Sequence, residues 1–74
     1  MLDTEHIDLL LQQDDMEVLY KMAHDKCYAF EGERLSLSHQ QQLSEYIDIL
    51  RICVKFRDNI TATKMHLREY QKAI

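Results

Sequence analysis

FRDNITATKMHLREY, residues 56–70, is a polar and charged stretch by composition. Read at helical spacing, however, Phe56, Ile60, Thr63, Leu67 and Tyr70 fall on one line, because steps of three and four residues return to the same face of an α-helix. Another part of the protein, or another chain, has to cover such a line. What covers it decides how the rest of the chain is arranged.

The same line extends beyond residues 56–70 in both directions. Ser36 and Ser38 are good N-caps, and neither glycine nor proline follows them, so we expect one long helix over residues 37–73. Alternating steps of three and four residues over about four heptads are typical of a coiled-coil seam. The line consists of Tyr46, Ile49, Cys53, Phe56, Ile60, Thr63, Leu67, Tyr70 and Ile74.

A second apolar line runs beside the first in the front half of the long helix. It consists of Leu43, Ile47, Leu50 and Val54, and the two lines together form a face wide enough to touch two neighbours. After Val54 the second line stops. From there Arg57, Lys64 and Arg68 flank the remaining narrow seam, as charges do at coiled-coil e and g positions.

The N-terminal half predicts a short helix over residues 4–12 and a middle helix over residues 14–30. Asp3 or Thr4 can cap the first, and Asp14 to Glu17 reads as an acidic capping box for the second. Whether residues 12 and 13 form a kink or continue one helix stays open. The middle helix has one apolar face, made of Met16, Leu19, Tyr20, Ala23, Cys27 and Phe30.

The absence of proline and the single glycine, Gly32, favour an all-α domain spanning residues 1–74. Gly32 suits a turn over residues 31–36, through which the middle helix folds back over residues 38–54 as a helical hairpin. The stretch from Phe56 onward then overhangs. Either the short N-terminal helix folds over it, or dimerisation or a helical partner covers it.

Charge and cysteine content limit the class of protein. Residues 1–33 carry nine acidic and two basic side chains, net −7, whereas residues 34–74 carry four acidic and seven basic side chains, net +3. Opposite halves of this kind attract each other. The total of −4 argues against nucleic acid as the main partner, so a nucleic-acid-binding regulator is the less favoured alternative. Cys27 and Cys53 indicate buried thiols of a reduced, cytoplasmic protein. No segment is long and apolar enough to predict a membrane span.

The side chains that could carry chemistry are few. His24 and Cys27 could form half of a zinc site, which needs four ligands, but no second motif supplies the rest. The same pair lacks an orienting group for nucleophilic catalysis. His24 or His39 could accept a phosphoryl group, and Lys64, Arg68 and Lys72 could bind phosphates or pair with Asp15 or Glu17. We therefore expect no enzyme, no cofactor and no metal.

Two resemblances add alternatives. Residues 44–50, Ser-Glu-Tyr-Ile-Asp-Ile-Leu, resemble the Ser-x-x-Leu-Asp-x-Leu signature of the small aspartyl-phosphate phosphatases that act on sporulation regulators, which are helical hairpins. That resemblance implies a role for Asp48, although Tyr46 stands where the family has an acidic residue. The Ile7 to Leu11 opening and the layout of short and long helices are similar to the small co-chaperones that brace type III secretion needle chaperones. That similarity implies a helical protein partner.

These observations predict a small non-catalytic protein-binding module, acting as an adaptor, co-chaperone or regulator. The competing class is a phosphatase or phosphotransfer regulator that uses Asp48 or a helical histidine. The partner would be another helical protein, a second copy of this chain, or both. The predicted partner-binding residues, here named the C-terminal seam, are Phe56, Ile60, Thr63, Lys64, Leu67, Arg68, Tyr70 and Ile74.

Overall fold

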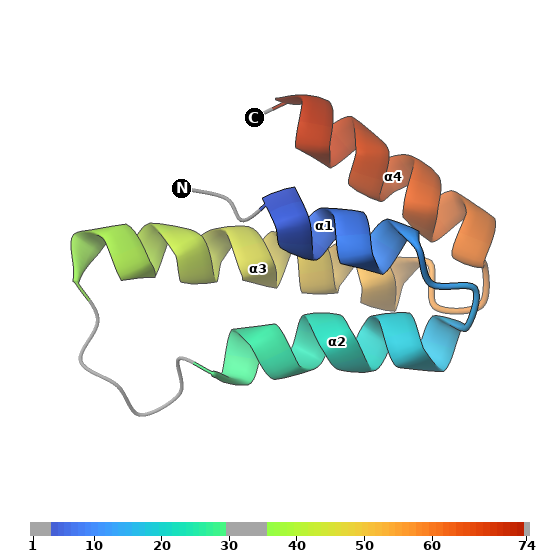
Figure 1. Cartoon of the computed structure of the whole chain (residues 1–74), viewed down its shortest axis with the longest axis horizontal. Helices are drawn as coiled ribbons and strands as arrows, with labels where there is room; N and C mark the ends of the chain where they lie inside the picture. The colour runs from blue at the N-terminus through green and yellow to red at the C-terminus, as the bar shows by residue number, and fades with distance from the viewer. Residues whose placement is uncertain (1–3, 30–35, 74) are drawn as a thin grey trace.

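A computed structural model of the protein describes residues 4–29 and 36–73. Within these residues the chain forms four helices and no strand, which confirms the all-α prediction. The helices are α1 (Thr4–Leu11), α2 (Met16–Tyr28), α3 (Leu37–Lys55) and α4 (Ile60–Ala73) (Figure 1). None of the described helices combines the length and apolar character that crossing a bilayer requires.

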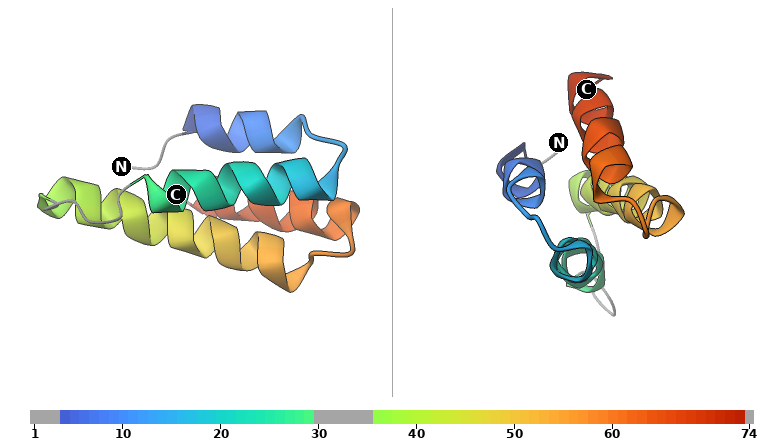
Figure 2. Two further views of the ribbon diagram at one scale, coloured as in Figure 1. Left: turned by 90° about the horizontal axis from the view of Figure 1, so that it is seen from below. Right: turned by 90° about the vertical axis from the view of Figure 1, so that its right-hand side faces the viewer.

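Successive helices run in opposite directions and surround a common centre (Figures 1 and 2). Each helix packs against the next one in the chain, and α4 closes the ring by packing against α1. This is the arrangement of an up-down-up-down four-helix bundle, in which short connections join antiparallel neighbours.

The prediction of one long helix over residues 37–73 is wrong, because the chain turns between Phe56 and Asn59. At Phe56 the backbone leaves the helical region, with φ −110° and ψ 31°, and α3 ends. Asn59 then caps α4, since its side-chain Oδ1 accepts a 3.0 Å hydrogen bond from the Ala62 backbone N–H. The reversal therefore needs neither glycine nor proline.

Thr63 stabilises this turn from inside the protein. Its side chain is fully buried, and its hydroxyl lies 3.0 Å from the carbonyl oxygens of both Phe56 and Asn59. The carbonyl groups at the end of α3 and just before α4 thus share the single proton of a buried hydroxyl. Thr63 is thus the polar member of an otherwise largely apolar line, and its hydroxyl binds the backbone of the turn.

The helix starts in the N-terminal half also differ in detail from the prediction. The cap of α2 is Asp15, whose carboxylate accepts a 2.9 Å hydrogen bond from the Glu17 N–H, so the helix begins at Met16. Leu11 ends α1, and the four residues after it form a connection, which makes residues 4–28 two helices. The predicted turn at residues 31–36 lies outside the described residues except for Ser36, whose Oγ caps α3.

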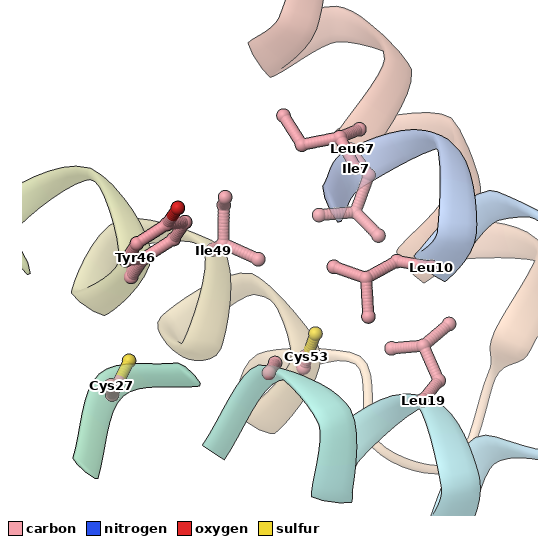
Figure 3. Close-up of a cluster of buried hydrophobic side chains, with 9 residues drawn as sticks. Ile7, Leu10, Leu19, Cys27, Tyr46, Ile49, Cys53 and Leu67 are labelled. Atoms are coloured by element: carbon pink, nitrogen blue, oxygen red, sulfur yellow. The ribbon is translucent and has the colours of Figure 1, made fainter. Parts of the chain in front are cut away.

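All four helices contribute to the core (Figure 3). In Figure 3, Ile7 and Leu10 of α1 lie between Leu67 of α4 and Leu19 of α2. Burying a side chain of this size stabilises the fold by about 1.5–3 kcal/mol, so the short α1 is an integral part of the bundle. Within the described residues, the buried apolar side chains are Ile7, Leu10, Leu19, Ala23, Cys27, Tyr46, Ile49, Cys53 and Leu67.

The predicted overhang of the C-terminal segment is therefore wrong as well, since α1 covers α4. Of the two covers that the sequence left open, the short N-terminal helix is the one observed. The end that projects is the opposite one, the start of α3, which reaches beyond α1 and α2 in Figure 1. Residues 36–41 are all exposed there.

Candidate protein-binding surface

The C-terminal seam is divided between the core and the surface. Thr63 and Leu67 are fully buried by the chain's own helices, so neither is open to a partner in this fold. Arg68 is exposed on α4, and Ile74 lies outside the described residues. The remaining seam residues are half-buried, namely Phe56, Ile60, Lys64 and Tyr70.

The polar residues along α4 make contacts to α1 and to the connection that follows it. The Lys64 ammonium lies 3.3 Å from the carboxylate of Asp14, and the side-chain amide of Gln71 donates a 3.1 Å hydrogen bond to Asp8. We expected the acids opposite Lys64 to be Asp15 or Glu17. Asp14 is free for this contact because Asp15 has taken the capping position.

Asp48, the residue singled out by the phosphatase resemblance, lies at the edge between α3 and α4. The Tyr70 hydroxyl donates a 3.4 Å hydrogen bond to its Oδ2. Burial, together with the negative charges of Asp48 and Glu45, raises the pKa of Tyr70 to about 12. The phenol therefore stays protonated and acts as a donor, which occupies one oxygen of the carboxylate. A nearby Glu45 oxygen, Oε2, is buried without a hydrogen-bond partner.

The histidines considered as phosphoacceptors are each held by a neighbour. His24 stacks on Tyr28, with ring centroids 4.2 Å apart and an interplanar angle of 21°. His39 Nδ1 lies 2.8 Å from the Ser36 hydroxyl at the start of α3. Both contacts are to residues three or four positions away on the same helix or at its cap, as helical geometry brings together.

The two thiols are buried, and burial raises the pKa of both. For Cys53 the pKa rises to about 12, which keeps the group in the unreactive thiol form at neutral pH. Within residues 4–29 and 36–73, no three His, Cys, Asp or Glu side chains lie close enough together to hold a metal ion.

The second apolar line of α3 is only partly covered, and we name it the α3 stripe (Leu43, Ile47, Leu50 and Val54). Ile47 is 37% exposed and Val54 is 50% exposed, whereas Leu43 and Leu50 are half-buried. Ile47, Leu50 and Val54 directly follow the buried Tyr46, Ile49 and Cys53. Each residue turns the helix by about 100°, so the stripe lies about 100° around α3 from the buried line.

The stripe faces away from α4. Residues that directly precede the buried line, such as Asp48 before Ile49, turn to the other side, where Asp48 contacts Tyr70 of α4. Since α3 packs on α2 and α4, the α3 stripe lies along the edge beside α2. The sequence showed the line but assigned its cover to the middle helix, which covers it only in part.

An aromatic row runs along α2, and its Tyr20 end lies beside the residues that follow α3. Tyr20, His24 and Tyr28 follow one another at four-residue steps, with 6.0 Å between the ring centroids of Tyr20 and His24. The Arg57 guanidinium, just after α3, lies 5.1 Å from the centroid of the Tyr20 ring. A hollow of about 450 Å³ opens at this end, lined by Met16, Glu17, Tyr20, Arg57 and Asp58.

Comparison with known proteins adds no relative. No family model matches the chain, and no curated protein or solved structure compared with it gives a match.

Proposed function

We propose that this chain is a small non-catalytic protein-binding module, and that it binds through the α3 stripe. One observation carries the proposal: four apolar side chains at steps of four, three and four residues form an exposed or half-exposed line on the longest helix. Single exposed apolar residues are ordinary on a protein surface. A continuous line at heptad spacing is the surface that a second helix packs against.

The size of the bundle supports association. The smallest domains bury a modest fraction of their surface and gain stability from metals, disulfides or partners. Here Val54, Met65 and Leu37 are among the large apolar side chains left exposed, at 50%, 49% and 74%. Covering the α3 stripe with a helix would add apolar burial to the face with the most regular spacing.

The partner that we propose is helical, either another protein or a second copy of this chain. We place the module in the cytoplasm because Cys27 and Cys53 are both free thiols, and thiols stay reduced in that compartment. An adaptor, co-chaperone or regulator would use such a surface in the same way.

Capture with matched variants tests the proposal. The wild-type protein, Val54→Asp and Met65→Asp are immobilised and exposed to native lysate, and the retained proteins are identified by mass spectrometry. Val54 and Met65 are almost equally exposed, so the two variants lose similar apolar surface and gain the same charge. They differ in that only Val54 belongs to the stripe.

The expected result is a protein retained by the wild type and by Met65→Asp but lost with Val54→Asp. Its complex with the wild-type chain must then form again from the two purified components, with the same sensitivity to Val54→Asp. The proposal is overturned if the wild type and Val54→Asp retain the same proteins and show the same self-association.

A further inference from the structure

We infer that the chain covering the α3 stripe is a second copy of this protein, packed antiparallel about a two-fold axis near Asp48 and Ile49. The inference rests on the proposed function, because it names the partner of the same surface. It follows from two features of α3: the symmetry of the stripe, and the distribution of charge along the helix.

The spacing of the stripe reads the same in both directions. Its steps are four, three and four residues, from Leu43 through Ile47 and Leu50 to Val54. In an antiparallel pair, Leu43 therefore meets Val54 of the second copy, and Ile47 meets Leu50 of the second copy. A two-fold contact has to be self-complementary in this way, because the same patch serves both chains.

The charges of α3 favour the antiparallel orientation. Residues 37–44 contain no Asp, Glu, Lys or Arg, whereas Arg51 and Lys55 are exposed near the other end of the helix. A parallel pair would bring Arg51 and Lys55 beside the same cations of the second copy, and like charges at that distance repel. The antiparallel pair puts each cationic end beside an uncharged end.

The stripe keeps apolar surface that a second helix could cover. Ile47 and Val54 are exposed, and Leu43 and Leu50 have half-buried side chains that a helix could cover further. The other edge of α3 is occupied by α4, through contacts such as Tyr70 to Asp48. One helix pair makes a small interface, and interfaces of that size are typical of weak, reversible association.

Sedimentation equilibrium tests whether the copy binds. The wild-type protein should pass from monomer to dimer across concentrations from about 5 to about 500 µM, since dimerisation follows mass action. Val54→Asp should raise the dissociation constant at least about tenfold, while Met65→Asp should leave it within about threefold of the wild-type value. Circular dichroism of both variants checks that the helices are retained.

Disulfide cross-linking tests the orientation. Leu43→Cys and Val54→Cys should form a disulfide when the two variants are mixed and oxidised, because the antiparallel pair places these positions face to face. Each variant alone should not, since equivalent positions lie about 16 Å apart along the axis and a disulfide needs Cα atoms within about 7 Å. The native thiols are buried, and mass spectrometry identifies the linked pair.

Each contrary result has a distinct meaning. A wild-type monomer at the highest concentration overturns the second-copy inference and leaves the proposed function to the capture experiment. A dimer that Val54→Asp leaves intact shows that another surface mediates dimerisation, which also overturns the inference. Self-linking of Leu43→Cys or Val54→Cys alone, without the mixed product, overturns the antiparallel orientation.

Discussion

The Tyr70 hydroxyl of α4 donates a 3.4 Å hydrogen bond to Asp48 of α3, and this contact joins the two helices well beyond the turn that connects them. The pair is 22 residues apart in sequence and would lie on one continuous helix if the chain did not turn after Lys55. The contact exists only because the helix breaks. The hydrogen bond needs the proton of the Tyr70 phenol, so removing that proton at high pH tests whether the helix breaks here.

Tyr70→Phe should change how stability depends on pH in alkaline solution. Burial and neighbouring carboxylates raise the folded-state pKa of Tyr70 to about 12, from 10.0. A raised pKa means that the protonated phenol is favoured by folding, so its contribution is complete below pH about 10 and is lost as pH rises through about 12. Urea unfolding of both proteins at pH values from about 9 to about 12 should show it.

The comparison removes the effect of all other titrating groups, because the two proteins share them. The wild type should lose stability more steeply than Tyr70→Phe above pH about 10, so that the two unfolding free energies converge. A difference that stays constant over this range would show that the phenol is not held by the fold in the way described.

Leu67→Ala should destabilise the whole bundle. Leu67 is fully buried in a core shared by all four helices, and large-to-small changes at such sites cost roughly 2–5 kcal/mol through lost burial and the remaining cavity. Thermal or urea unfolding measures the loss. Leu67→Asp should unfold the chain, because it places a charge in this buried core.

Arg68→Ala is the matched control for Leu67→Ala. It is the next residue on α4 but is exposed, and exposed substitutions usually change stability by less than about 0.5 kcal/mol. Equal effects of the two changes would mean that α1 does not cover α4.

The sequence predicted which positions are buried contacts, but it did not predict that these positions are divided between two antiparallel helices. Tyr46, Ile49, Cys53, Thr63 and Leu67 all belong to the predicted line, and all are buried. Their spacing continues across the turn, because Phe56 and Ile60 are four residues apart on either side of it. Periodicity alone therefore favoured an unbroken helix, while the competing signal was only a capping residue, Asn59, without glycine or proline.

The binding surface was harder to predict for a different reason. α3 has two apolar lines, and both have the spacing of a helix seam. Which line becomes buried depends on where α2 and α4 pack, and that arrangement follows from contacts between residues far apart in sequence. Once α4 turns back along α3, α1 can cover Leu67, and the line through Ile47 and Val54 stays outside.

Asn59→Ala should weaken the start of α4. Its Oδ1 accepts a hydrogen bond from the Ala62 N–H, and loss of an N-cap typically costs about 1 kcal/mol. Asn59→Asp keeps the acceptor oxygen and adds a negative charge, which the helix N-terminus favours. Urea unfolding should therefore rank the wild type and Asn59→Asp together, above Asn59→Ala. Equal stability of the alanine and aspartate variants would contradict the cap.

The two thiols should react slowly with a thiol reagent, and Cys53 should be the slower. The reactive form is the thiolate. Cys53 is fully buried with its pKa raised to about 12, whereas Cys27 is 7% exposed and its pKa is raised by burial. Reaction at Cys53 then requires opening of the core, so Leu67→Ala should accelerate it by about tenfold for each 1.4 kcal/mol of lost stability. Arg68→Ala should leave the rate unchanged.

Labelling of the folded protein at pH about 8, with the unfolded protein as reference and peptide mapping of each site, gives both rates. Faster labelling of Cys53 than of Cys27, or no acceleration by Leu67→Ala, would show that the α3 core is more open than this packing allows.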